Sequence, residues 1–282
     1  MNIEHTYLVT GSTGLLGGYL MNEASKYGRV SGVARSSSDF DCDLTKIEDV
    51  RNMIATIQPD VVLHAAAMVD VDACENDHKS AWANNVLAVK NLVETISPDT
   101  WLVFFSTIAV YPDTVGPHRE NIVGPVNYYG KTKLEAEKII NNHMNHLVFR
   151  GAMFGPSLRE GRMSLSDFII DRLSRKQTVT LFDDELFSPL HISNFSKIIL
   201  KSVKNGLKGT YNIGSHNGMS KSDFGCAVAK HLGLSTESAN VDASTTTSGR
   251  SRRALDMRLD PSHLEKDLNF SMPTLMEEIK KL

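Results

Sequence analysis

The glycine spacing near the start of the chain constrains the fold more than any other feature of the sequence. Gly11, Gly14 and Gly17 follow a short apolar run at 6–10 that suits a buried strand of a parallel sheet. In a strand–turn–helix unit, Gly11 permits a tight turn, Gly14 lets the backbone approach a pyrophosphate, and Gly17 lets the helix pack on the strand. The helix N-terminus then offers free N–H groups to phosphate. We predict a dinucleotide-binding turn, with a plain strand-to-helix turn as the alternative because GxxGxxG differs from GxGxxG.

Apolar runs and amphipathic stretches alternate over the first 150 residues. Strands are expected at 6–10, 30–34, 61–64, 101–105 and 147–149, and helices at 15–26, from Thr45 to 57, at 75–96 and at 128–144. This alternation predicts an α/β fold, a doubly wound, Rossmann-like parallel sheet with helices on both faces. From Gly151 the rhythm loosens, with short strands at 178–182 and 210–213. We predict a Rossmann domain at 1–150 and a smaller C-terminal substrate lobe, mainly 151–282, some segments of which return to the first domain.

Composition and net charge limit the classes of binding partner and the cellular compartment that we expect for this protein. The net charge of −3 gives no reason to expect nucleic acid or an anionic membrane. The three cysteines, Cys42, Cys74 and Cys226, have no paired or metal-ligand spacing, so we expect a reducing compartment and no metal. The start of the chain has no basic-then-apolar signal, and no run approaches the roughly 18 apolar residues of a membrane span. We therefore expect a cytoplasmic protein.

The end of the second expected strand carries a basic residue where an NAD-specific site usually has an acidic one. Ala34 is followed there by Arg35 and Ser36. An NAD site uses Asp or Glu to hold the ribose 2′-hydroxyl, whereas a guanidinium pairs with a 2′-phosphate in a forked geometry. NADP(H) is therefore the preferred cofactor. NAD(H) stays possible because Asp39 and Asp41 follow soon after, and a solvated Arg35 is the alternative interpretation.

Tyr129 and Lys133 are spaced so that they share one face of a helix. A free phenol has a pKa of about 10, and we expect a fixed ammonium one turn away to lower it. Thr107, at the end of the fourth expected strand, would offer a hydroxyl to a substrate carbonyl. We predict Thr107, Tyr129 and Lys133 as catalytic residues, the last two also in contact with the cofactor. The alternatives are a surface pair, and Tyr128 in place of Tyr129, although only Tyr129 has a lysine four residues on.

Several motifs spread over most of the chain occur together in one known family. The nucleotide turn reads GSTGLLG, and DCDLT at 41–45 matches an acidic-apolar step beside adenine. PDVVLHAAA followed by VDACE resembles PDVIINAAAYTAVDKAE, and VNYYGKTKLEAE resembles PLNVYGKTKLAGE. Near the end, Arg253 with Leu259 and Asp260 resembles RPxNSxLD. The chain thus resembles the extended short-chain dehydrogenases/reductases and, more narrowly, the dTDP-4-dehydrorhamnose reductase family.

The resemblance implies an NADPH-linked reduction of a 4-keto group on a nucleotide-activated deoxysugar. Hydride would pass to the carbonyl carbon, Tyr129 would protonate the oxygen, and Lys133 would also hold the nicotinamide ribose. His64 replaces the usual Asn of the family at the sheet edge. Besides Arg35, Tyr129 and Lys133, the expected cofactor contacts are Gly11, Thr13, Gly14, Leu15, Leu16, Gly17, Ser36, Asp43, Leu44, His64, Ala65, Ala66 and Asn85.

The substrate site is expected mainly in the second half of the chain. A nucleotide diphosphate needs cations, and Arg253 or Arg258 would pair with phosphate, with a solvated basic loop as the alternative. His191 is either a substrate contact or a structural histidine. Ile108 and Ala109 stand where sugar-nucleotide dehydratases carry Asp-Glu, so dehydration is disfavoured. The expected substrate contacts are Ser106, Met68, Met153, His191, Arg253 and Arg258.

Three functions fit these features. The first is an NADPH-dependent nucleotide-sugar 4-ketoreductase. The second is an NAD(P)-dependent epimerase or reductase that acts on another sugar nucleotide; epimerases usually favour NAD, so Arg35 argues against this function. The third is a non-catalytic NADP-binding regulatory subunit similar to the methionine adenosyltransferase β subunit. In each case resemblance allows a homodimer formed through two long helices.

Overall fold

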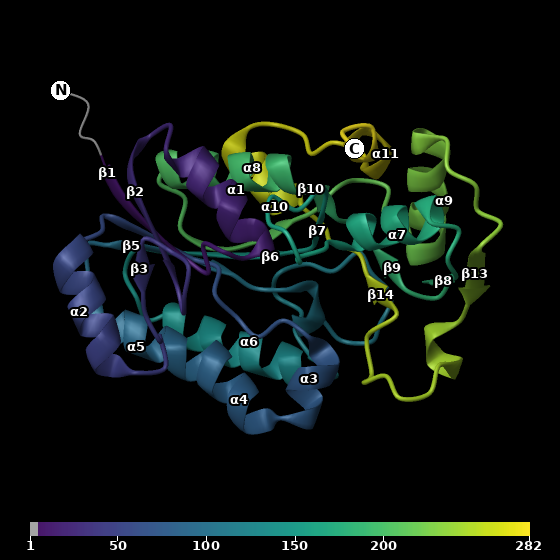
Figure 1. Ribbon diagram of the computed structural model, residues 1–282. Coiled ribbons are helices and arrows are strands. Elements are labelled where there is room, and N and C mark those ends of the chain that lie inside the picture. The colour runs from purple at the N-terminus through teal and green to yellow at the C-terminus, as the bar shows by residue number, and fades with distance from the viewer. Residues whose placement is uncertain (1–4) are drawn as a thin grey trace.

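A seven-stranded, all-parallel sheet forms the centre of the protein. A computed structural model describes residues 5–282. The strand order is β11-β6-β5-β4-β1-β2-β3, and every neighbouring pair runs parallel. This arrangement confirms the predicted doubly wound α/β fold (Figure 1). The strands are β1 (His5–Thr10), β2 (Gly28–Ala34), β3 (Phe40–Asp41), β4 (Val61–His64), β5 (Trp101–Phe105), β6 (His146–Gly151) and β11 (Gly209–Ile213).

Helices cover both faces of the sheet (Figure 1). Alternate residues of β1 serve the two faces: Tyr7 and Val9 pack in one buried cluster and Leu8 in the other. Such alternation follows from the two-residue period of a strand. One face carries α1 (Leu15–Ala24), α8 (Ile192–Lys204) and α10 (Ser262–Leu268), and the other α2 (Ile47–Ile57), α5 (Ala88–Thr95) and α6 (Tyr128–Ile140).

The helix expected at 75–96 is interrupted. It consists of α3 (Val71–Asn76), α4 (His78–Trp82), the π-helical turn η1 (Ala83–Leu87) and α5. Asp77 ends α3 and caps α4, since its carboxylate accepts the Ser80 N–H at 2.9 Å. Two other expected boundaries also differ. Thr45 does not cap α2, which begins after Lys46, and α6 ends at Ile140 rather than near 144.

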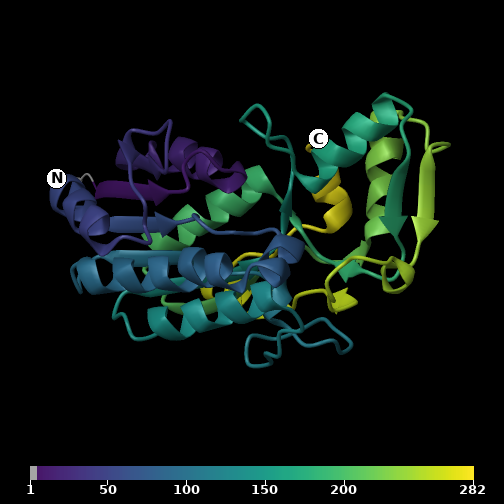
Figure 2. The same ribbon diagram turned by 60° about the horizontal axis from the view of Figure 1, so that its bottom comes forward.

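A smaller lobe lies beside the sheet (Figure 2). It contains three small sheets and a core built around Phe154, Phe187 and Phe224. Although they follow residue 150, β11, α8 and α10 belong to the main sheet or pack on it. The elements of the lobe are β7 (Met153–Phe154), α7 (Leu165–Ser174), β8 (Val179–Phe182), β9 (Leu186–Phe187), β10 (Leu190–His191), β12 (Met219–Ser220), α9 (Lys221–Leu232), β13 (Ala239–Asp242), η3 (Ser244–Thr246), β14 (Asp256–Met257) and α11 (Leu275–Ile279).

Across residues 5–282, no helix is both long and apolar enough to cross a membrane.

Phe224 tests whether this lobe depends on its aromatic core. Its ring is fully buried and meets the Phe154 and Phe187 rings edge-on, with centroids 5.0 and 5.3 Å away. We expect Phe224→Ala to lower the free energy of unfolding by about 3–5 kcal/mol, because a large cavity replaces the ring. Urea denaturation measures the loss. Phe168→Ala, at an exposed ring of α7, is the control; equal losses in the two variants would contradict the assignment.

Candidate functional site

The glycine turn brings α1 against the carboxyl ends of β1 and β4. Gly11 has φ +66°, and a Cβ there would lie 2.8 Å from the Ala66 backbone. A Cβ on Gly17 would lie 2.1 Å from the Gly11 carbonyl oxygen, so the strand and helix can approach this closely only without side chains. Gly14 caps α1, whose first N–H groups face the turn. Thr13 and Leu15 are half-buried here, and Leu16 is buried in the core.

Local hydrogen bonds hold the acidic residues that follow β2. The Asp39 carboxylate accepts the Gly32 N–H at 2.8 Å, and Asp41 accepts the Ser38 hydroxyl at 3.1 Å. Arg35 and Ser36 are exposed at the end of the strand. Arg35 therefore offers an exposed cation directly after β2, in a segment where Asp39 and Asp41 are exposed as well.

Asp43 and Leu44 follow the short strand β3, which ends at Asp41. The Thr45 hydroxyl donates to the Asp43 carboxylate at 2.7 Å, and this bond lowers the pKa of that carboxyl. Leu44 is buried, and its carbonyl accepts the Asn91 amide at 2.9 Å. These bonds hold both residues beside the sheet edge where an adenine is expected.

Thr10, His64 and Phe104 form a row on one face of the sheet, at paired positions of β1, β4 and β5. The Thr10 hydroxyl lies 2.7 Å from His64 Nδ1 and also accepts the Ala66 N–H at 3.3 Å, which holds the segment 65–66. His64 Nε2 is buried without a hydrogen-bond partner among the described residues. Burial, with a smaller effect of the Lys133 charge, lowers the pKa of His64 to about 3. His64 is therefore neutral.

Thr107, Tyr129 and Lys133 meet at the carboxyl edge, as the sequence predicted for a catalytic group. The Thr107 hydroxyl caps the 3₁₀ turn η2 (Ile108–Val110) by accepting the Ala109 N–H at 3.1 Å, and all three side chains are buried. Asn127 caps α6 by accepting the Gly130 N–H at 2.9 Å, which fixes the turn that carries Tyr129. The group therefore comes from the end of β5 and the first two turns of α6.

The expected effect of Lys133 on the Tyr129 phenol is wrong for this structure. Burial raises the pKa of Tyr129 to about 12, and the neighbouring Thr107 hydroxyl opposes this rise only in part. Burial also lowers the pKa of Lys133 to about 7, and its Nζ lies 3.9 Å above the centre of the Phe104 ring. Both shifts have one cause: removal from water disfavours the charged form of each group.

Two neighbouring polar residues have structural partners. Tyr128, the competitor of Tyr129, stacks on His78 with ring centres 3.6 Å apart, and its N–H donates to Glu75. Asn85, expected at the cofactor, instead accepts the Met68 N–H at 2.8 Å and donates to the Met68 carbonyl and the Thr132 hydroxyl, both at 3.0 Å. Asn85 thus holds the loop after β4 in place.

The expected substrate residues do not all face one site. The Ser106 hydroxyl donates to the Glu137 carboxylate. Met68 packs in the cluster that contains Tyr129, whereas Met153 packs against the core beneath α1 and α8. His191 is buried at the start of α8, where its Nδ1 lies 2.8 Å from the Ser193 hydroxyl. These contacts favour the structural alternative for His191.

The arginines expected to hold phosphate are each paired with a carboxylate. Arg253 donates to both oxygens of Asp72 at 3.3 and 3.0 Å, which holds the pKa of that carboxyl well below its usual range. Arg258 donates to both oxygens of Asp256 at 2.9 and 2.6 Å. A phosphate would have to share each arginine with its carboxylate or displace the carboxylate from it. A cavity of about 260 Å³ beside Arg253 is lined by Glu185, Ser244, Thr245, Thr247, Arg250, Ser251, Arg252, Arg253 and Leu255.

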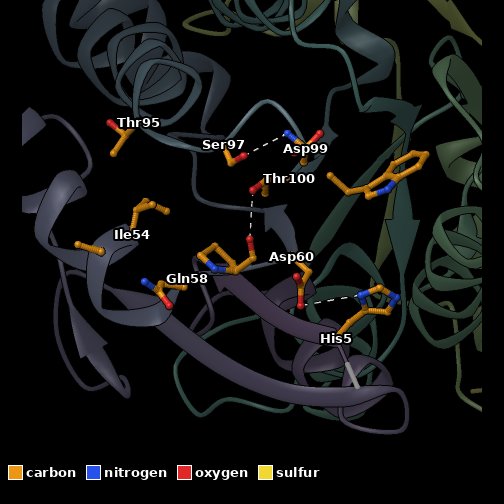
Figure 3. A pocket seen from close by; sticks show the side chains of 11 residues that line it. His5, Ile54, Gln58, Asp60, Thr95, Ser97, Asp99 and Thr100 are labelled. Carbon is orange, nitrogen blue, oxygen red and sulfur yellow. Dashed lines mark hydrogen bonds and ion pairs between the residues drawn. The ribbon is translucent and has the colours of Figure 1, made fainter. Parts of the chain in front are cut away.

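A larger depression, of about 660 Å³, lies at the opposite edge of the sheet (Figure 3). Its lining includes His5 at the start of β1, Asp60 just before β4 and Trp101 at the start of β5. The Thr100 hydroxyl donates to the Pro59 carbonyl at 3.1 Å within it. Because ligands of open parallel sheets bind at the carboxyl ends of the strands, this depression is not the cofactor site.

The sequence did not predict a buried ion pair that lies beside the proposed catalytic residues. Glu137 lies one turn after Lys133 on α6, and Arg150 lies in β6; Arg150 Nη2 donates to Glu137 at 2.6 Å. The four-residue spacing from Tyr129 through Lys133 to Glu137 was a signal that all three share a helix face. Arg150 carried no such signal, because the sheet brings it there.

His64 provides a pH test of this site. With a pKa of 6.5 when unfolded and about 3 when folded, the histidine is neutral in both states above pH 6.5. Below that pH the unfolded chain takes up one more proton, which costs about 1.4 kcal/mol of stability per pH unit until pH 3. We expect His64→Asn to lose less stability than wild type between pH 6.5 and 5 in urea denaturation. Parallel losses in the two proteins would contradict a neutral buried His64.

The family profile described as the RmlD substrate binding domain matches residues 5–282. A probable low-salt glycan biosynthesis reductase from Haloferax volcanii is 28% identical over 97% of this chain and 96% of its own. The methionine adenosyltransferase 2 subunit beta from Xenopus laevis is also 28% identical, over 92% of this chain and 81% of its own. A solved dTDP-4-dehydrorhamnose reductase from Bacillus anthracis, in complex with NADP, superposes with a TM-score of 0.87 at 19% identity and covers 99% of this chain and 98% of that one. These matches confirm the predicted family, and the chain belongs to the dTDP-4-dehydrorhamnose reductase-like proteins of the RmlD substrate binding domain family.

Proposed function

We propose that this protein is an NADPH-dependent oxidoreductase that reduces the 4-keto group of a nucleotide-activated deoxysugar. The observation that carries the proposal is the convergence of Thr107, Tyr129 and Lys133 at the carboxyl edge of the sheet, beside the glycine turn. Membership of the reductase family supports the same reaction class. The glycan biosynthesis reductase similar along nearly the whole chain supports a sugar substrate.

The residues present fit a dinucleotide. The positions where Cβ atoms of residues 11 and 17 would lie are filled by neighbouring backbone, so the strand, turn and helix form a bare backbone cradle at the N-terminus of α1. A bound NADPH would supply the hydride. Gly14 and the first N–H groups of α1 would hold its pyrophosphate, and Ala65 and Ala66 would line its path along the sheet edge.

Tyr129 is in the protonation state that a reduction needs. With its pKa raised to about 12, the phenol keeps its proton at neutral pH. It can therefore donate that proton to the carbonyl oxygen as hydride arrives at the carbon. Thr107, whose hydroxyl lowers the pKa of the phenol in part, would orient the same oxygen. The apolar residues Ile108 and Ala109 that follow offer no acid or base for dehydration.

A regulatory, non-catalytic role is the second candidate. The similarity to the methionine adenosyltransferase β subunit favours it, because the identity is 28%, equal to that of the glycan biosynthesis reductase, over 92% of this chain. The retained Thr107, Tyr129 and Lys133 favour catalysis. Turnover of a keto-sugar separates the two.

Tyr129→Phe tests the proton donor. We expect wild-type protein to oxidise NADPH in the presence of dTDP-4-keto-6-deoxy-L-mannose. The variant should lose about 10²–10⁴-fold in kcat, because the substitution removes the hydroxyl that donates the proton and little else. Absorbance at the reduced nicotinamide band measures the rate, and NADPH binding by fluorescence shows that the variant is folded. Tyr128→Phe is the matched control and should keep its rate. Tight NADPH binding without turnover by wild type would favour the regulatory candidate.

Arg35→Ala tests the cofactor preference. If the exposed guanidinium pairs with the 2′-phosphate, its removal should raise the Kd for NADPH about tenfold or more and leave the Kd for NADH nearly unchanged. Fluorescence titration with both cofactors measures the two constants. Equal changes for the two cofactors would contradict this role, and Arg29→Ala, an exposed arginine elsewhere on β2, is the control.

A further inference from the structure

Glu137 is a buried carboxylate to which the proposed reaction assigns no role. Its side chain is 2% exposed, and three hydrogen-bond donors surround it. Arg150 approaches it with Nε at 3.0 and 3.2 Å and with Nη2 at 2.6 Å, and the Ser106 hydroxyl donates to the same Oε1 that accepts Nε at 3.0 Å. Its oxygens are therefore fully engaged, and Glu137 is not placed to exchange protons with a substrate.

Stability alone does not account for this ion pair. Replacing a buried pair with apolar residues of similar size is often neutral or stabilising, because desolvation of two charges offsets their attraction. Arg150 is also 6% exposed, so both charges lie away from water. A pair of this kind next to a catalytic group is a candidate for a role in that group.

Two connections lead from Glu137 to the proposed catalytic residues. The first runs through Ser106, which directly precedes Thr107, so the hydrogen bond to Glu137 holds the turn that presents the Thr107 hydroxyl. The second runs along α6, where Lys133 lies one turn before Glu137 on the same face. The Glu137 charge favours the ammonium form of Lys133.

The other titratable groups around Lys133 supply little charge. His64, from β4, is neutral, and Tyr129, from the preceding turn of α6, keeps its proton. Cys74, from α3, is a thiol whose pKa burial raises to about 11. Glu137 is therefore the charged neighbour that opposes the effect of burial on Lys133.

We propose that Glu137 is a positioning residue of the active site: it holds the Ser106–Thr107 turn and supplies the counter-charge that keeps Lys133 in its ammonium form, while Arg150 anchors the carboxylate. This role rests on the proposed function, since it concerns the lysine of the same catalytic group. Arg150 is itself held from the other side, where Nη1 donates to the Glu120 carbonyl at 2.7 Å.

The test follows the titration of Lys133 directly. Protein with isotopically labelled lysine is titrated by NMR, and the Lys133 signal is assigned by its loss in Lys133→Met. Wild-type Lys133 should titrate near pH 7. In Glu137→Gln we expect the midpoint to move down by about one pH unit, which would lower kcat/KM about tenfold on the alkaline side of the profile. An unchanged midpoint would overturn the proposal.

Two further variants separate positioning from a structural role. Glu185→Gln removes a fully buried carboxylate, paired with Lys221 and Arg250, from the smaller lobe. It should cost stability without moving the Lys133 midpoint; an equal shift there would also overturn the proposal. If Glu137→Gln does not fold, the double variant Glu137→Met and Arg150→Met is compared with Arg150→Met alone, so that only the Glu137 charge differs. The midpoint must be lower in the double variant for the proposal to stand.

The outcome for Glu137 is distinguishable from the outcome for the proposed function. The NMR titration needs no substrate. A midpoint that shifts in Glu137→Gln, in a protein that shows no turnover, would support the positioning role of Glu137 and contradict the reductase function. Turnover with a midpoint that is the same in wild type and Glu137→Gln would support the reductase and remove the role of Glu137.

Discussion

The burial of the Lys133 side chain against the Phe104 ring is the constraint that organises the centre of this molecule. The lysine is 2% exposed and lies at the carboxyl edge of the sheet. Removing an ammonium from water costs several kcal/mol unless neighbouring groups offset it. Glu137 supplies the opposite charge one turn further along α6, and Arg150 and Ser106 satisfy that carboxylate in turn. The turn after β5, the middle of α6 and the end of β6 thus form one connected polar cluster.

Two polar connections join the sheet to the segments around the site. On one side, the Tyr111 hydroxyl donates to Asn212 in β11, which extends the Arg150 cluster to the edge strand. On the other side, Asp72 of α3 accepts bonds from Arg253 and from the Ser251 N–H, which ties the loop before β14 to the nucleotide-binding part.

Features set by local spacing were predictable, and features set by distant contacts were not. The glycine turn, the five expected strands and the Tyr129–Lys133 pair each depend on residues close in sequence, and their positions agree with the prediction. The prediction of one helix at 75–96 was wrong at Asp77. This residue is a local helix cap, and the prediction considered only the apolar periodicity. The π-helical turn carries Asn85, whose side chain bonds Met68, seventeen residues earlier, and no periodicity reports such a contact.

By itself, the sequence determined the parallel fold, the nucleotide turn and the identity of the residues that can exchange a proton, because each needs a residue type at a fixed local spacing. Only the tertiary structure decided the electrostatics of the site. Burial, which depends on every element packed around a group, raises the pKa of Tyr129 and lowers that of Lys133. The folded structure also pairs Arg253 with Asp72 and brings Arg150 to Glu137. Each of these two contacts joins different segments of the chain, which come together only when the chain folds.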